Sequence, residues 1–323
     1  MKKFLTVLAT IPFLSSCGGN SSSVGLTASG ATFPAPFYTR IFSNYSKESG
    51  NRVNYQAVGS GAGVRQFFAG TIDFGASDKA VPDEKIDQPL VQIPIVGGAI
   101  VPAYNKPGCD LKLTQRQLAD VYLGKITNWS KLGCDEGRII VVYRSDGAGT
   151  TAGWTNSLSA FSPEWREKVG TSKAVAWPVG IGAKGNSGVA AQIQNVDGAI
   201  GYLNYGYVSG GKFQEALIQN KAGNYVKANA ETSSAGLSQI VLDSQLRGSN
   251  PNPGGENSYP IVSLTWILAS PDYRKNDTIK EVLRYMLSEE SQSQADALGY
   301  VPLPENLRQQ SLESVDSLIN TTS

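Results

Sequence analysis

Three glycine-rich turns, each running into a helix-like apolar pattern, constrain the fold of this chain most strongly. They read Ser-Gly-Ala-Thr-Phe-Pro over residues 29–34, Gly-Ser-Gly-Ala-Gly over 59–63 and Arg-Ser-Asp-Gly-Ala-Gly-Thr-Thr over 144–151. The first turn of a helix leaves backbone N–H groups unpaired at the positive end of the helix dipole, so each turn can accept an anion. Three such turns, one of them with an arginine, predict a protein that surrounds a small oxyanion.

Strand patterns precede these turns. Apolar and polar residues alternate over 52–57, and the run 138–143 reads Arg-Ile-Ile-Val-Val-Tyr, as in a short buried strand. Helical apolar spacing follows over 37–45 and 64–68. Strands that repeatedly feed helices predict an α/β fold with ligands at the carboxyl ends of the strands.

The N-terminus has the pattern of a secretory signal. Lys2 and Lys3 precede an apolar run that is too short for a membrane span, and Leu-Ser-Ser-Cys follows over 14–17. This ending resembles a bacterial lipobox, in which Cys17 becomes the lipidated first residue. We therefore expect a signal peptide over 1–16 and a lipidated tether over 17–24, with an ordinary signal peptide and a chance cysteine as the alternative.

The remaining cysteines, Cys109 and Cys134, most simply form a disulfide in an exported chain. The chain contains no histidine, so the usual neutral-pH base and the Ser-His or Cys-His nucleophile pairs are absent. We therefore expect neither a hydrolase nor a metal site, and no cofactor.

Charge and length limit the remaining possibilities. The chain has 28 Lys and Arg against 27 Asp and Glu, so it has no bulk attraction to nucleic acid. Its length exceeds the usual limit of about 250–300 residues for a single core. We expect one lobe from 25–98 and 265–323, a second from 105–258, and strand-like crossovers near 99–104 and 259–264.

Each turn carries candidate ligand groups that also have an ordinary structural role. Thr32 and Ser60 are typical helix caps, although the glycines around Ser60 leave the backbone open to a ligand. Asp78 ends the run Asp-Phe-Gly-Ala-Ser-Asp over 73–78 and either caps the next segment or accepts a hydrogen bond from a protonated oxyanion. A site that bonds a substrate O–H rejects the analogue lacking it by roughly 10⁴–10⁵-fold, so the second role would select phosphate over sulfate.

The third turn combines Arg144 with Asp146. A guanidinium suits a tetrahedral oxyanion, and a neighbouring carboxylate can hold it in place. Surface pairs of this kind are usually inconsequential, but the glycine-rich helix start favours the functional interpretation. A fourth glycine-rich turn, over 182–188, contains Lys184, which could reach an anion; there we favour a purely structural turn.

Taken in order, these segments resemble the periplasmic phosphate-binding proteins of bacterial ABC phosphate uptake systems. The resemblance runs from about Leu26 to Leu303. The matching stretches are residues 28–36, 53–56, 73–78, 121–126, 144–150, 177–178, 182–188 and 198–202.

The resemblance implies an α/β, two-lobed type II periplasmic-binding-protein fold with phosphate buried in a cleft between the lobes. It implies that Asp78 accepts the phosphate proton, that Arg144 makes the charged contact and that Asp146 restrains Arg144. The implied hydrogen-bond donors are Thr32, Phe33, Ser60, Ala148, Gly149 and Thr150.

One residue departs from the family pattern. The family commonly has a serine hydroxyl on phosphate where this chain has Ala148, so one contact worth about 1.5–3 kcal/mol is missing. We expect weakened or rearranged binding unless Thr151 or an ordered water compensates.

The resemblance predicts a monomeric, non-catalytic receptor, lipid-anchored in the periplasm or at the cell surface. It would pass inorganic phosphate to an ABC permease with its ATPase. The alternatives are a receptor for arsenate or sulfate, an exported phosphatase-like enzyme, and a phosphate sensor or adhesin that never meets a permease.

Overall fold

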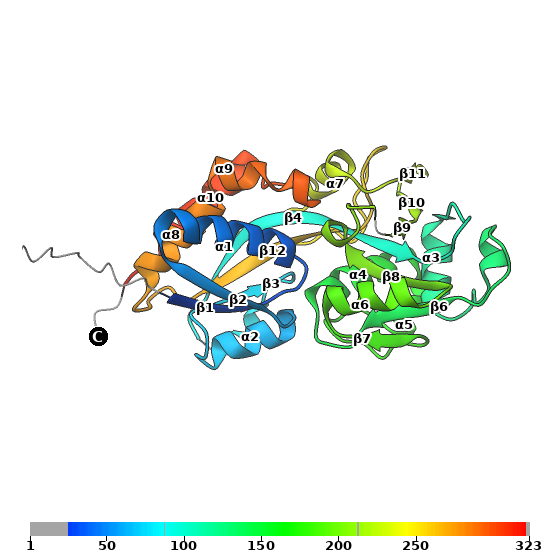
Figure 1. The fold of residues 1–323 in the computed structure, drawn as a ribbon, viewed down its shortest axis with the longest axis horizontal. Helices are drawn as coiled ribbons and strands as arrows, with labels where there is room; N and C mark the ends of the chain where they lie inside the picture. The colour runs from blue at the N-terminus through cyan, green and yellow to red at the C-terminus, as the bar shows by residue number, and fades with distance from the viewer. Residues whose placement is uncertain (1–24, 87, 212, 321–323) are drawn as a thin grey trace, which may run out of the picture.

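The computed structural model describes residues 25–86, 88–211 and 213–320. The predicted signal peptide, the tether and Cys17 lie outside the described residues. Figure 1 shows two lobes side by side, joined through the long strand β4 (Val91–Tyr104). Within the described ranges, no helix is both long and apolar enough to cross a membrane.

The first lobe is built on strands from both ends of the chain. Its order across the sheet is β2-β1-β3-β12-β4, with β1 parallel to β2 and β3, and with β12 antiparallel to β3 and β4. The strand bounds are β1 (Gly25–Gly30), β2 (Arg52–Ala57), β3 (Phe74–Ser77) and β12 (Val262–Ala269).

Helices cover both faces of this half of the sheet. Figure 1 shows α1 above and α2 below the strands β1 to β3, with the C-terminal helices beside α1. The ring centroids of Tyr45 in α1 and Tyr285 in α8 lie 5.4 Å apart. The helix bounds are α1 (Ala35–Ser49), α2 (Ser60–Phe68), α8 (Asn276–Met286), α9 (Glu289–Ser293) and α10 (Glu305–Asp316), with short 3-10 turns at Asp83–Lys85 and Asp296–Leu298.

The second lobe continues the same sheet. The order beyond β4 is β8-β6-β7, with β6 parallel to β7 and β8, while β9 pairs with β4 and a separate three-stranded sheet runs β11-β10-β5. Its strands are β5 (Lys112–Leu113), β6 (Ile140–Arg144), β7 (Ile181–Ala183), β8 (Ala199–Asn204), β9 (Gln214–Glu215), β10 (Leu217–Gln219) and β11 (Tyr225–Val226). Its helices and 3-10 turns are α3 (Gln115–Tyr122), Trp129–Leu132, α4 (Gly149–Phe161), α5 (Pro163–Lys168), α6 (Gly185–Asn195) and Tyr205–Tyr207.

Strand β4 belongs to both halves of the sheet. Residues 91–99 pair with β12, and residues 100–104 pair with β8. The predicted α/β architecture in two lobes is confirmed, whereas the residue boundaries proposed for the lobes stay a prediction. Helix α7 (Ala230–Leu237) lies within the proposed 105–258 segment yet packs near Gly97 of β4, where an added Cβ would meet the Leu237 side chain.

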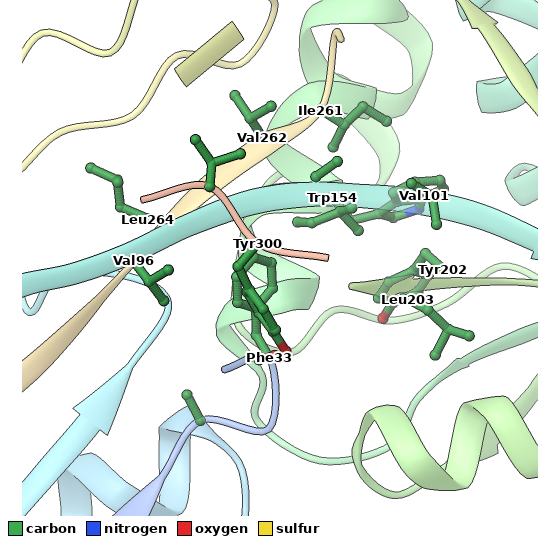
Figure 2. Packing of buried hydrophobic residues seen from close by; sticks show 14 of the residues in the cluster. Phe33, Val96, Val101, Trp154, Tyr202, Leu203, Ile261, Val262, Leu264 and Tyr300 are labelled. Atoms are coloured by element: carbon green, nitrogen blue, oxygen red, sulfur yellow. Dashed lines mark hydrogen bonds between the residues drawn. The ribbon is translucent and has the colours of Figure 1, made fainter. Parts of the chain in front are cut away.

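The apolar core runs through the junction of the lobes without a break. Figure 2 shows Val96 and Val101 of β4 in this cluster, with Phe33 and Tyr300 on one side and Trp154 and Tyr202 on the other. Phe33 and Tyr300 meet edge to face with ring centroids 6.1 Å apart. Apolar side chains that bury together in this way resist opening, so β4 is held firmly at the point where the chain passes between lobes.

The disulfide between Cys109 and Cys134 is present, with Cα atoms 5.2 Å apart. It links the loop before β5 with the loop that follows the 3-10 turn Trp129–Leu132. By loop-closure arguments such a bond stabilises the folded chain by about 3 kcal/mol.

Gly63 in α2 lies so close to the backbone of β1 that an added methyl group should destabilise the folded protein. Its Cβ would lie 2.9 Å from the Ser29 carbonyl oxygen and closer still to the Cα of Gly30. We expect Gly63→Ala to lower the free energy of unfolding by about 1–3 kcal/mol in thermal or denaturant unfolding, because backbone must shift. The matched control is Gly188→Ala in α6, where the nearest atoms are 3.6 Å away, and where removal of a helical glycine stabilises by roughly 0.5–1 kcal/mol. Equal effects at the two positions would contradict the packing described for Gly63.

Candidate oxyanion-binding site

The turn between β1 and α1 is held from behind by tyrosines. Three buried or half-buried tyrosine hydroxyls donate to three successive carbonyl groups: Tyr55 to Ala31 at 2.6 Å, Tyr207 to Thr32 at 2.7 Å and Tyr300 to Phe33 at 2.7 Å. In the described part of the chain, the backbone N–H groups of Thr32 and Phe33 have no hydrogen-bond acceptor. The turn therefore presents two free amide donors on a fixed backbone.

Ser60 begins α2 and lies at the contact between the lobes. Its Oγ accepts the backbone N–H of Asp78 at 3.2 Å and that of Gly149 at 3.1 Å, and donates to Asp78 Oδ2 at 3.4 Å. Gly59, directly before it, has a φ of 97°, which an L side chain rarely adopts. The glycine-rich turn thus places a fully buried hydroxyl between the two lobes.

Asp78 follows β3 and is only 4% exposed. Its Oδ2 accepts from Thr150 Oγ1 at 3.3 Å, long for such a bond, and its Oδ1 is buried with no partner among the described residues. Burial raises the pKa of Asp78 to about 7, against the opposing effects of Arg144, Thr150, Lys173 and Ser60. A ligand that donates an O–H hydrogen bond would satisfy the unpaired oxygen.

Arg144 ends β6 and is 2% exposed. Its guanidinium forms a two-pronged pair with Asp146, with Nε to Oδ1 at 2.8 Å and Nη2 to Oδ2 at 2.6 Å, and Nη1 reaches Thr150 Oγ1 at 3.4 Å. Burial alone would raise the pKa of Asp146, but Arg144 and the N–H of Gly185 lower it below the usual range. Asp146 therefore stays ionised and orients the guanidinium.

Asn186 in α6 is a site residue that sequence reasoning missed. This fully buried side chain donates from Nδ2 to Thr32 Oγ1 at 2.9 Å and to Thr150 Oγ1 at 3.4 Å, and so joins the two lobes. The signal that could have found it is the glycine-rich turn over 182–188, in which only the charged residue was considered. That residue, Lys184, is exposed.

The structure thus brings together six buried polar residues from both lobes, here called the interlobe cluster. Its members are Thr32, Ser60, Asp78, Arg144, Thr150 and Asn186. One connected set of hydrogen bonds runs through all six. Five of them were predicted site residues; their role as ligands stays a prediction.

The two remaining predicted ligands are the backbone amides of Ala148 and Gly149, and both donate within the protein. The N–H of Ala148 donates to the Lys173 carbonyl at 2.9 Å, and that of Gly149 donates to Ser60 Oγ. Both amides therefore already have partners. Thr151, considered as a substitute for the missing serine hydroxyl, is paired with the Tyr202 hydroxyl at 2.6 Å.

Two glycines allow the lobes to approach this closely. The N–H of Gly61 donates to the Gly147 carbonyl across the interface at 2.7 Å. A Cβ at position 149 would lie 2.6 Å from Asp78 Cβ and 2.8 Å from its Cα. Only a residue without a side chain fits there, so the start of α4 lies directly on the end of β3.

Tyr202 supports the cluster from the second lobe. Its hydroxyl accepts the backbone N–H of Arg144 at 3.1 Å, and its ring stacks on Trp154 at 5.0 Å and Trp177 at 5.7 Å between centroids. The aromatic stack fixes the hydroxyl and through it the end of β6.

The cluster offers hydroxyl, amide and guanidinium donors around one carboxylate, which suits a small, partly protonated oxyanion. Over the described ranges, no group of three or more His, Cys, Asp or Glu side chains could hold a metal ion.

The buried carboxylate predicts a pH-dependent stability. The folded protein keeps a proton on Asp78 up to about pH 7, whereas the unfolded chain loses it near pH 4, so folding stability falls as the pH rises between these values. We expect Asp78→Asn to unfold at a higher temperature than the native chain in buffers without multivalent oxyanions. The advantage should grow to the order of 2–4 kcal/mol from about pH 4 to about pH 7.

The matched control is Asp73→Asn at the other end of β3. Asp73 accepts from Thr27, Lys275 and Tyr273, and although burial opposes it, these partners lower its pKa. Asp73→Asn should destabilise the protein at neutral pH. An advantage of Asp78→Asn that is the same at pH 5 and pH 8 would show that Asp78 is not buried as described.

Comparisons with known proteins place the chain in a family. A model described as a PBP superfamily domain matches residues 17–290. The phosphate-binding protein PstS of Pasteurella multocida is 41% identical over 301 residues, covering 88% of each chain. PstS of Haemophilus influenzae is 39% identical over 325 residues, covering 94% of this chain and 95% of that one.

The fold agrees with this placement. The crystal structure of a phosphate-binding protein from Stenotrophomonas maltophilia superposes with a TM-score of 0.69 at 20% identity, over 90% of this chain and 94% of that one. The predicted two-lobed periplasmic-binding-protein fold is therefore confirmed. The chain belongs to the PBP superfamily and, within it, to the PstS family of phosphate-binding proteins, which bind solutes and are not enzymes.

Proposed function

We propose that this protein is an extracytoplasmic receptor that binds inorganic phosphate between its lobes and delivers it to an ABC permease. The observation that supports the proposal best is the position of Asp78. A buried carboxylate with an unpaired oxygen lies among donors from both lobes. Relatives named for phosphate binding cover most of the chain.

The cluster has the chemistry to distinguish phosphate from sulfate. Both are tetrahedral dianions near neutral pH, but phosphate still carries a proton. Ionised Asp78 accepts a hydrogen bond from that proton, whereas it repels a fully deprotonated anion. Arg144 and the free amides of Thr32 and Phe33 would bind the remaining oxygens, with Ser60 and Thr150 turning their hydroxyls toward the ligand.

The size of the ligand limits the affinity. Five heavy atoms at a ceiling of about 1.5 kcal/mol each give roughly 7.5 kcal/mol, which corresponds to a dissociation constant of micromolar order. This is a suitable scale for a scavenging receptor. Contacts between lobes, such as Gly61 with Gly147, would form as the lobes close on the anion and exclude water.

Arsenate is the closest competitor, because it is protonated much as phosphate is. Under this proposal, Asp78 would favour phosphate over sulfate without separating it from arsenate. The first test must therefore include all three anions.

Calorimetric titration of the processed protein tests the proposal directly. We expect phosphate to bind with a dissociation constant of micromolar order or below, arsenate to compete and sulfate to compete at least about 100-fold less well. Asp78→Asn should reduce the preference for phosphate over sulfate by at least about tenfold, since an amide can donate to either anion. Native protein that does not bind phosphate, or an Asp78→Asn variant with unchanged selectivity, would contradict the proposal.

We further propose that Cys17 carries a lipid anchor, with the protein monomeric at the outer face of a membrane. Basic residues, a short apolar run and Leu-Ser-Ser-Cys over 14–17 support this. The permease and its ATPase would receive phosphate from the closed form, whose two lobe surfaces are then adjacent.

Substitution at Cys17 tests the anchor. Native protein expressed in a bacterial host should incorporate labelled fatty acid and partition with membranes, because acyl chains bury many methylene groups at about 0.8 kcal/mol each. Cys17→Ser should lose both properties and keep phosphate affinity. Label retained by this variant would exclude lipidation at this residue.

A further inference from the structure

Lys173 is a charged residue at the lobe interface with no part in the proposed phosphate contacts. It lies in the segment between α5 and β7 of the second lobe and is half-buried. Its Nζ donates to Ser77 Oγ at 3.2 Å, across the interface. Ser77 is the last residue of β3 and directly precedes Asp78.

The main chain of Lys173 contacts its own lobe, at the start of α4. The Lys173 carbonyl accepts the N–H of Ala148, the residue that precedes α4, at 2.9 Å. One residue thus connects the start of the helix that carries Thr150 with the end of the strand that precedes Asp78. This connection can form only when the lobes are together.

The ammonium group of Lys173 is one of two cations that affect the ionisation of Asp78. Arg144 and Lys173 are the cations that act on this carboxylate, and the hydroxyls of Ser60 and Thr150 face it as well. Arg144 has the larger of the two effects and also forms an ion pair with Asp146 at 2.6 Å, and Lys173 adds to it. Among the described residues, Lys173 forms no ion pair within 4.0 Å.

The groups that face Lys173 leave it cationic at neutral pH. Burial lowers the pKa of Lys173 to about 8, Asp78 opposes this shift, and Lys79 and Lys85 add to it. The charge of Lys173 therefore remains available to the carboxylate beside it. The tyrosines whose own ionisation Asp78 disfavours, Tyr38, Tyr55, Tyr207 and Tyr300, are uncharged in this range.

We propose that Lys173 is a positioning residue for anion selectivity: its ammonium group, held on Ser77 across the lobe interface, keeps Asp78 ionised and therefore selective for a protonated oxyanion. The inference rests on the proposed function, because it concerns how the same site distinguishes its ligands.

The sign of the effect follows from the two forms of Asp78. Ionised Asp78 accepts a hydrogen bond and rejects sulfate, whereas protonated Asp78 can donate to either anion. Selectivity for phosphate should therefore fall as the pH falls through the midpoint of Asp78. Removal of the Lys173 charge disfavours the ionised form, so the midpoint moves to higher pH.

The experiment measures the ratio of the sulfate and phosphate dissociation constants from about pH 5 to about pH 9, for native protein, Lys173→Met and Lys173→Arg. We expect the midpoint of this ratio to rise by at least about half a pH unit in Lys173→Met, with up to about a threefold loss of selectivity at neutral pH. Lys173→Arg should restore the native profile. Phosphate changes from H₂PO₄⁻ to HPO₄²⁻ over this range while sulfate stays a dianion, but this titration is common to all variants, so the comparison between variants isolates the effect of residue 173.

Lys79→Met is the matched control. It removes the same charge from the residue that follows Asp78, but its exposed side chain has no hydrogen bond or ion pair to the cluster, so the midpoint should not move. Lys173→Gln replaces Lys173→Met if the latter does not fold, as judged by thermal unfolding. An unchanged midpoint in the folded uncharged variant, or an equal shift in Lys79→Met, overturns the role of Lys173 while native phosphate binding still stands. Absence of phosphate binding by native protein would instead overturn the proposed function.

Discussion

The structure depends on a carboxylate buried between two lobes. Asp78 is removed from water, and the two cations that lower its pKa, Arg144 and Lys173, come from the other side of the interface. Isolated ionised carboxylates are costly to bury, so the surrounding residues must either compensate the charge or keep the proton on. Burial raises the pKa of Asp78 even beside these cations, so they compensate the charge only in part. Under the proposed function, a protonated oxyanion would supply a further hydrogen-bond donor.

The glycines and tyrosines around the cluster determine how close the lobes come. Gly149 lets α4 rest on the end of β3, and Gly61 brings its amide to Gly147. Tyrosine hydroxyls from β2 and from distant parts of the chain hold the carbonyls of the first turn, in which the amides of Thr32 and Phe33 have no acceptor among the described residues. Under the proposed function, these contacts would hold the donors in place, so that selectivity could depend on a single proton.

Much of this arrangement could be predicted from sequence, because the relevant signals are local. The turns before α1, α2 and α4 are marked by glycine and hydroxyl residues, and β4 and β12 lie over the two apolar runs expected to cross between lobes. The roles of Tyr207 and Lys173 could not be predicted because their partners are distant in sequence, as in the 175-residue separation of Tyr207 from Thr32. The glycine-rich turn over 182–188 marks the position of Asn186 but not its contact with Thr32, 154 residues away. The partners already held by the Ala148 and Gly149 amides depend on lobe packing, which no local pattern records.

Under the proposed function, the unpaired oxygen of Asp78 would connect selectivity to lobe closure. This oxygen is buried in the structure, and leaving a buried acceptor unsatisfied costs about 1–3 kcal/mol, or more when it is charged. A protonated oxyanion would remove this cost by donating to it, whereas sulfate would add repulsion. Under the proposed function, phosphate would therefore favour the closed form more than sulfate does, beyond any difference in initial attraction. A permease that recognises both lobe surfaces would meet them together only in the closed form. Asp78 would therefore affect selectivity at two steps: when the anion binds and when the closed form docks on the permease.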